Sequence, residues 1–371
     1  MRKSKYNSRF HKGERGLSLP VLRFPNSQSD LDRLVSQMSL IAEVYSSTSE
    51  RFSLDDMRDV LASRSQISSS GASGTFAVSL STRTDRSRDP LYNQVKMMSE
   101  IYRMFGWIRS TPDSRLVFQM THLGLTLALD AAKFGPEIRS SLIRESVLHV
   151  VFPNETTKNV GVANHRPFAW LILLAHHLDG FITRDEIIVG VLGTLDDRKP
   201  GKMREVVSRL QKARTEGGTA ELVRKLSTEN RVQVNSLHNY TRLPIGILSS
   251  PITGWAKSSA RTFIGDSSSA RGYELTPQGI QAAKVILKSF DLRRAELNKL
   301  SLSERSIVAD YAFCMILLNA GIPIEFIEEG LKDITNEAKR VLKKLGVSRG
   351  QKLLFNPELQ ETDLVLQRLK E

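Results

Sequence analysis

Two short triplets carry residue types that metal-dependent nucleases use, an acidic residue followed two positions later by a lysine. They are Asp197-Arg198-Lys199 and Glu337-Ala338-Lys339. Phosphodiester cleavage of this kind needs several carboxylates around a divalent cation, and the common arrangement places the triplet and a further acid on adjacent strands. The first triplet stands in an expected loop before Pro200 and the second in an expected helix. We therefore predict no catalytic residue in this chain.

Histidine and cysteine usage gives no pattern of metal ligands. His176 and His177 lie next to each other in an apolar stretch without a nearby cysteine, which favours packing over metal binding. Cys314 is the only cysteine, so an internal disulfide and a multi-cysteine zinc site are excluded. The sequence contains no phosphate-binding glycine loop and no nucleophile elbow. We predict no metal site and no cofactor in this chain.

Amide and cationic side chains form a larger group that suits contact with DNA. Asn and Gln can form paired hydrogen bonds with adenine, while Arg and Lys can pair with guanine or neutralise phosphates. The candidates in the first half of the chain are Arg83, Arg86, Arg88, Asn93, Gln94, Lys96, Arg109 and Arg115. The candidates in the second half are Lys202, Arg204, Arg209, Lys212, Asn239, Arg242, Lys257, Arg261 and Arg271. The prediction concerns the set, because any one of these residues alone is an ordinary surface residue.

The overall charge points to the same class of partner. The 371 residues include 53 Lys and Arg against 40 Asp and Glu, which gives a formal net charge of +13. A surplus of this size favours a polyanion, namely DNA, RNA or an anionic membrane. The longest apolar stretches, such as residues 168–175, are too short to span a membrane, and no signal peptide follows the basic N-terminus. We expect a cytoplasmic protein with no membrane partner.

A repeated pattern indicates how these candidates are positioned. An apolar strand leads into a helix opened by Thr-x-x-Gly at Thr121 and again at Thr276, and a looser copy has Asn356-Pro357 at the same place. The Thr or Asn oxygen can cap the new helix, and proline at a first-turn position loses no hydrogen bond. Helices, a hairpin and a closing helix follow one another in this order at the end of a winged-helix module.

We therefore expect a mainly α fold with small β-hairpins, built from tandem winged-helix modules. The predicted parts are a basic N-terminal arm at residues 1–29, a first module at 30–135, a second module with a long insertion at 136–292, and a smaller winged-helix-like module at 293–371. Because a winged helix places its third helix in the major groove and its wing on the backbone, the helix that begins at Pro90 would present Asn93, Gln94 and Lys96 to bases.

The expected elements follow from apolar periodicity and capping residues. In the first module they are helices at 31–45, 54–62 and 90–105, a loop at 63–88, a hairpin around Pro112 and a closing helix at 121–133. In the second they are helices at 136–151, 165–179, 184–192, 202–214 and 237–248, a wing with a long tip at 257–271, and a helix at 276–290. The third has helices at 303–319, 323–331 and 335–345, a hairpin at 346–352 and a last helix from Pro357.

Several of these segments resemble one family of restriction enzymes. The segments are Phe105-Gly106-Trp107-Ile108, residues 116–127, 166–174 and 179–187, and, near the C-terminus, Leu345-Gly346-Val347, residues 353–358 and Asp363-Leu364. Together they resemble the DNA-recognition half of AlwI-type type IIS restriction and nicking endonucleases and, more distantly, the recognition modules of FokI-like enzymes. The resemblance extends over most of residues 31–369.

The resemblance implies modules that bind an asymmetric duplex site beside a C-terminal, metal-dependent nuclease domain. This sequence ends where that domain would begin, so the expectation is a specificity subunit or recognition region. Its partners would be double-stranded DNA and a separate nuclease subunit or domain, for which Mg²⁺ is expected. Two alternatives stay open: a winged-helix transcription regulator or replication-initiator-like protein, and a nuclease whose carboxylates come from distant segments.

Overall fold

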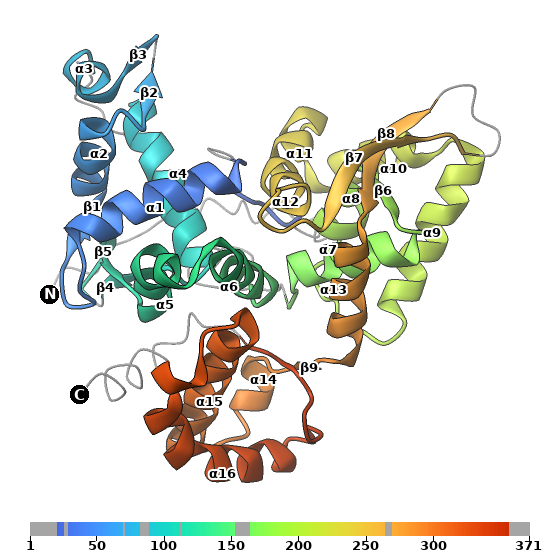
Figure 1. The fold of residues 1–371 in the computed structure, drawn as a ribbon. Coiled ribbons are helices and arrows are strands. Elements are labelled where there is room, and N and C mark those ends of the chain that lie inside the picture. The colour runs from blue at the N-terminus through green and yellow to red at the C-terminus, as the bar shows by residue number, and fades with distance from the viewer. Residues whose placement is uncertain are drawn as a thin grey trace, which may run out of the picture.

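The computed structural model describes residues 21–25, 29–69, 71–81, 89–111, 113–152, 164–263 and 269–355. The chain is mainly helical with small, mostly antiparallel sheets (Figure 1), which confirms the predicted fold class. Among the described residues, no helix is long and apolar enough to cross a membrane. Arg83, Arg86, Arg88 and the helix expected from Pro357 lie outside the described residues.

The first winged helix has three helices and a three-stranded sheet in the expected order. Its elements are α1 (Leu31–Val44), β1 (Phe52–Ser53), α2 (Leu54–Ser63), α4 (Pro90–Met104), β4 (Ile108–Thr111) and β5 (Ser114–Met120). The strands pair antiparallel in the order β1-β5-β4. Asp89 caps α4 by accepting from the backbone N–H groups of its first turn, and Pro90 occupies the first helical position. These signals explain why the third helix begins where the sequence predicted it.

The prediction of a loop at residues 63–88 was wrong for those of its residues that the structure describes. It contains β2 (Ser68–Ser69), β3 (Ala72–Ser73) and α3 (Gly74–Ser79), which packs on α2. Gly74 has φ +60°, and a Cβ atom built there would lie 2.8 Å from the carbonyl oxygen of Ala62. The close approach of α3 to α2 therefore depends on a glycine, and the polar composition of the segment concealed this packing.

A helical connection joins the two winged helices. It runs through α5 (His122–Leu125), the π-helical turn η2 (Thr126–Asp130), the 3₁₀ turn η3 (Ala131–Phe134) and α6 (Pro136–Leu148).

The second winged helix repeats this order with a larger insertion. Its elements are α7 (Pro167–His177), β6 (Phe181–Thr183), α8 (Arg184–Ile187) with η4 (Ile188–Leu192), α11 (Val234–Tyr240), α12 (Arg242–Leu248), β7 (Ala256–Arg261), β8 (Ala270–Leu275) and α13 (Pro277–Lys288). The sheet order is β6-β8-β7. The insertion comprises α9 (Lys202–Glu216) and α10 (Thr219–Asn230). The wing strands extend further than predicted, so the tip lies between Arg261 and Ala270.

In each winged helix, one threonine hydroxyl makes the same pair of hydrogen bonds with the backbone. The Thr121 hydroxyl donates to the Gly106 carbonyl at 2.6 Å and accepts from the Gly124 N–H at 2.9 Å. The Thr276 hydroxyl likewise donates to the Gly254 carbonyl at 2.5 Å and accepts from the Gly279 N–H at 3.1 Å. The predicted capping role of both threonines is confirmed. A tryptophan follows each first glycine, so the repeat is Gly-Trp before the wing and Thr-x-x-Gly after it.

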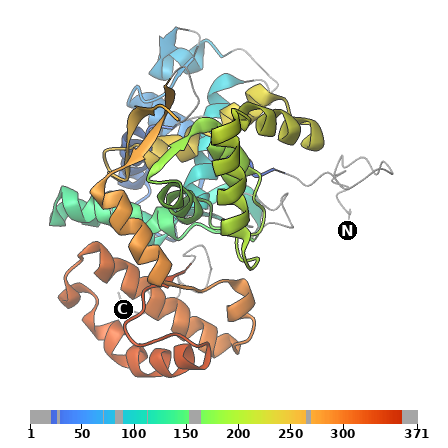
Figure 2. The same cartoon turned by 90° about the vertical axis from the view of Figure 1, so that its right-hand side faces the viewer.

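The C-terminal part contains α14 (Arg294–Leu297), α15 (Leu302–Ala320), η5 (Ile324–Phe326) and α16 (Glu328–Lys344), and it forms a layer below the winged helices (Figures 1 and 2). The predicted hairpin at 346–352 was wrong. Gly346 and Gly350 have φ of +85° and +75° and turn the chain. The chain then enters β10 (Leu353–Leu354), which pairs parallel with β9 (Phe290–Asp291). Two predicted helices, at 323–331 and 335–345, are instead a 3₁₀ turn followed by the single helix α16.

The N-terminal arm ends in a buried segment, residues 21–25, which we call the strap. Val21, Leu22 and Phe24 are almost completely buried. The Leu22 N–H donates to the Leu192 carbonyl at 2.9 Å, which lies in the second winged helix, before the chain enters α1 of the first. The end of the predicted basic arm, residues 21–25, is therefore part of the core, while residues 1–20 lie outside the described residues.

One apolar core runs through both winged helices. The largest buried cluster extends from the strap to α13 and also includes part of α15. A second, smaller cluster is formed by the C-terminal helices together with β9 and β10. The predicted module boundaries at 135/136 and 292/293 stay a prediction.

We predict that the glycine in each Thr-x-x-Gly pattern is required for stability. A Cβ atom at Gly124 would lie 2.0 Å from the Trp107 carbonyl oxygen, whereas Gly218 has no such neighbour within 4 Å. Gly124→Ser should therefore destabilise the protein by about 2 kcal/mol or more, and Gly218→Ser should be close to neutral. Urea denaturation measures both values. Equal stability of the two variants would contradict this account of the contact.

Candidate nucleic-acid interface

The third helix of the first winged helix carries three of the predicted base-contacting residues. On α4, Lys96 is exposed, and Asn93 and Gln94 are half-buried, while Val95 and Met98 are buried beneath them. Arg103, near the end of the same helix, is buried with its guanidinium 5.4 Å from the centre of the Phe118 ring. The polar surface of α4 is thus concentrated in its first two turns.

The first wing carries the predicted cations on both of its strands. Arg109 on β4 is half-buried and Arg115 on β5 is exposed. At the turn between the strands, Arg51 and Asp113 form an exposed ion pair at 3.1 Å. A hydrogen bond from Thr111, together with the Arg51 guanidinium, holds the pKa of Asp113 below its usual value. The charged carboxylate therefore offsets one positive charge at the wing.

In the second winged helix, α11 and α12 occupy the position that α4 has in the first. They precede Gly254-Trp255, with residues 249–253 in between, as α4 precedes Gly106-Trp107. Asn239 is half-buried and Arg242 is exposed on these helices. Asn235 is also exposed there, and sequence reasoning missed it. The Gly-Trp pair that precedes both wings could have identified it.

The second wing is less positively charged at its surface than its sequence suggests. Glu274 on β8 lies 3.6 Å from Lys257 and 3.7 Å from Arg261 on the neighbouring strand. The Arg261 guanidinium also lies 4.9 Å from the centre of the Phe181 ring. Arg271 is exposed and makes no ion pair among the described residues. It is therefore the wing cation best placed to meet a phosphate.

Helix α9 presents four predicted cations on a different part of the molecule. Arg204, Arg209 and Lys212 are exposed, and Lys202 is half-buried. Two of the four are ion-paired within the helix, Lys202 with Glu205 at 2.7 Å and Lys212 with Glu216 at 3.7 Å. Figure 1 shows α9 at the right-hand edge, far from α4. The structure thus does not bring the nominated residues into one group: α9 and α4 lie apart, and Arg271 of the second wing lines a pocket together with Ala213 and Arg214 at the end of α9.

The carboxylates considered for nuclease chemistry have structural partners. The Asp197 side chain is 6% exposed, with the Arg293 guanidinium at 2.7 Å and the His165 ring at 3.2 Å. Glu337 is exposed and lies 3.2 Å from Arg340 on the same helix. Among the described residues, no group of three or more His, Cys, Asp or Glu side chains is placed to hold a metal ion.

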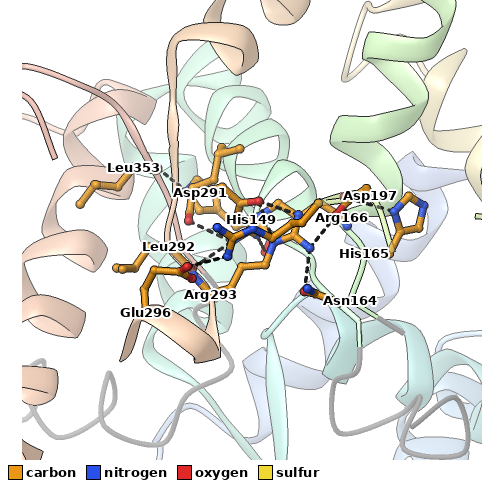
Figure 3. A network of polar contacts seen from close by, with 12 residues as sticks. His149, Asn164, His165, Arg166, Asp197, Asp291, Leu292, Arg293, Glu296 and Leu353 are labelled. Atoms are coloured by element: carbon orange, nitrogen blue, oxygen red, sulfur yellow. Dashed lines mark hydrogen bonds and ion pairs between the residues drawn. The ribbon is translucent and has the colours of Figure 1, made fainter. Parts of the chain in front are cut away.

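A buried polar network joins the second winged helix to the C-terminal part (Figure 3). The Arg166 guanidinium is 2% exposed, contacts the Asp291 carboxylate at 2.5 Å, and donates to the backbone carbonyls of His149, Leu292 and Leu354. Arg293 bridges Asp291 and Asp197. Burial would raise the pKa of both carboxyls, but the surrounding hydrogen bonds and positive charges hold each pKa below its usual value. All ionised groups are paired, so the network is structural.

Comparison with known proteins gives a structural similarity. The chain is similar to the structure of restriction endonuclease FokI, with a TM-score of 0.37 and 16% sequence identity. The match covers 89% of this chain and 62% of the FokI chain, so this chain spans about three fifths of the FokI length. No family model matches the sequence, and no curated protein matches it. The similarity assigns no role to any residue.

We predict that removing one charge from the buried network is costly. Asp197→Asn should destabilise the protein by about 1.5–3 kcal/mol, because it removes one of the two charged hydrogen-bond acceptors of the buried Arg293 and leaves only Asp291. Glu205→Gln makes the same chemical change at an exposed ion pair and should cost less than about 1 kcal/mol. Chemical denaturation at pH 7 gives both values. A similar cost for the two variants would show that the network does not hold the parts together.

Stability should also depend on pH through His149. This histidine is completely buried between the carbonyls of Glu145 and Leu353, and burial lowers its pKa to about 4. An unfolded histidine accepts a proton near pH 6.5. The neutral form therefore stabilises the fold fully above pH 6.5, and this contribution is lost as the pH falls towards 4, by up to about 3 kcal/mol. His149→Gln should flatten the stability profile between pH 6.5 and 4, and an unchanged slope would contradict this assignment.

Proposed function

We propose that this chain recognises a specific double-stranded DNA sequence as the specificity subunit or recognition region of a type IIS restriction or nicking endonuclease. The observation that carries the proposal is the repetition of one arrangement. In each winged helix, the helices that precede the Gly-Trp pair, α4 in the first and α11–α12 in the second, carry amide and cationic side chains that are half-buried or exposed, in a chain with a net charge of +13. The catalytic nuclease, with its Mg²⁺, would be supplied by a separate subunit or domain.

The side-chain types on these helices fit the edges of bases in the major groove. Asn93 and Gln94 on α4, and Asn239 on α11, can pair with adenine, while Lys96 and Arg242 can contact guanine or a phosphate. The wing cations Arg115 and Arg271 would lie on the phosphate backbone, which positions the protein without reading sequence. The proposal thus separates residues that determine specificity from residues that determine affinity.

Two unlike winged helices in one chain favour an asymmetric target. A regulator that dimerises binds a site with two-fold symmetry, whereas α4 and α11–α12 present different residues from a single chain. A footprint with two-fold symmetry would support the alternative of a transcription regulator or replication initiator. An asymmetric footprint favours a recognition region of the restriction type.

We predict that the purified chain selects one sequence from random duplexes and does not cut it in the presence of Mg²⁺. Asn93→Ala and Asn239→Ala should each weaken binding to the selected site by about 5- to 150-fold and relax the preference at one position. Asn336→Ala, at an exposed asparagine of α16, is the matched control and should change neither property.

Electrophoretic shifts over a range of salt concentrations complete this test. Affinity should fall with a log–log slope of roughly −0.9 per phosphate contact, and Arg271→Gln should reduce the slope by about one contact without changing the selected sequence. Equal binding of all duplexes at moderate salt would overturn specific recognition. Cleavage by the chain alone would overturn the assignment of the nuclease to another subunit or domain.

A further inference from the structure

We propose that the two winged helices form one rigid DNA-binding unit, which we call the rigid reader. It can make its two groups of base contacts only when the contacted base pairs are separated by one fixed spacing along the DNA. This inference rests on the proposed function, because it concerns the same two base-contacting helices. The residues that impose the spacing are those of the strap, Phe24 above all, together with the direct contacts between the two modules. None of these residues needs to touch DNA.

The strap, which precedes the first module in the chain, packs on the second module. The Leu22 N–H donates to the Leu192 carbonyl at the end of η4, and the Arg23 guanidinium lies 5.8 Å from the centre of the Tyr240 ring on α11. The Phe24 ring lies 5.5 Å from Phe152 and 5.6 Å from Phe168, measured between ring centres. The strap is therefore held on the second module immediately before the chain forms α1 of the first.

A close backbone approach also fixes the chain just before α1. A Cβ atom at Gly246 on α12 would lie 2.0 Å from the carbonyl oxygen of Ser29, two residues before α1. Helix α12 thus packs directly on the chain that enters the first module. This contact joins the helix that we assign to base contact in the second module to the start of the first.

A further contact joins the two modules without the strap. The Phe105 ring, next to the end of α4, lies 6.1 Å from the Phe168 ring at the start of α7. The connecting helix α6 is also held on the second module, because the Arg144 guanidinium donates to the Ile252 carbonyl, between α12 and β7, at 3.0 Å. Close-packed interiors change between discrete arrangements and do not stretch continuously. The modules are therefore held in a single relative position, in contrast to two domains on a flexible linker.

A fixed separation has a direct consequence for DNA recognition. One base pair inserted between two contacted groups moves the second group by about 3.4 Å and rotates it by about 35°, since a turn of about 10.5 base pairs rises about 34–36 Å. Hydrogen bonds to base edges do not survive a displacement of this size. A rigid reader must lose one group of contacts, whereas flexible modules can follow the shift.

The first experiment uses the wild-type chain. Substitutions on α4 and on α11–α12 first identify which base pairs of the selected site each helix contacts. Duplexes are then made with one base pair inserted or removed between these two groups of base pairs. We expect each change of spacing to weaken binding by about 100-fold or more, the loss of a whole group of base contacts. If a change of spacing weakens binding by less than about threefold, the inference is overturned. It is also overturned if all the selected base pairs form one uninterrupted group that a single helix contacts.

The second experiment tests whether the strap imposes the spacing. Phe24→Ala should reduce the ratio of affinities between the native and altered spacings at least tenfold, because the loosened modules can shift. Phe76→Ala, at a phenylalanine of α3 that is 63% exposed, is the matched control and should leave the ratio unchanged. A residue that serves stability alone would weaken binding to all duplexes equally, and that outcome would overturn the role of Phe24.

The milder Phe24→Leu variant repeats the test if the alanine variant fails to fold, with a smaller change in the same direction. Failure of the inference differs from failure of the proposed function. A chain that selects no sequence contradicts both, whereas a chain that selects a sequence but tolerates altered spacing contradicts only the rigid reader.

Discussion

The position of both wings depends on one close approach, in which a glycine Cα lies against a tryptophan carbonyl that accepts from the threonine N–H. A threonine hydroxyl bridges the start of the wing and the start of the closing helix, and the glycine three residues later leaves no room for a side chain. The strand pairs and third helices on either side of this contact are fixed relative to one another. The same arrangement at Thr121 and Thr276 therefore produces two similar surfaces from two dissimilar sequences.

Further contacts join the two winged helices to each other and to the C-terminal part. The strap, the Phe105–Phe168 contact and the shared apolar core hold the winged helices together, and the buried Arg166 and Arg293 network holds the C-terminal part against them. Buried ion pairs add little net stability over apolar packing, but they are costly to break. The ion pairs of Arg166 and Arg293 link three segments that are far apart in the sequence and favour one relative position of them. Specific positioning of base-contacting side chains requires this kind of constraint.

The sequence predicts the local features well because each has a local cause. Apolar periodicity, Pro90 at a helix start, the Thr276 cap and the turn around Pro112 locate α4, α13 and the first wing within a few residues. Long-range features could not be predicted in the same way. The burial of Leu22 and Phe24, the packing of α3 through Gly74 and the pairing of β10 with β9 depend on partners more than ten residues away. The nominated cations were individually recognisable, but only the tertiary fold shows that those of α9 lie apart from the third helices and that Glu274 lies between Lys257 and Arg261.

The central claim is that α4 and α11–α12 face one DNA duplex while α9 does not. Because Cys314 is the only cysteine and is buried, the variants Gln94→Cys, Asn239→Cys and Arg209→Cys each provide one reactive thiol. The decisive measurement is the rate of maleimide labelling of each thiol with and without the selected duplex. The account predicts strong protection at positions 94 and 239 and an unchanged rate at position 209. Protection at 209 with unchanged rates at 94 and 239 would contradict it.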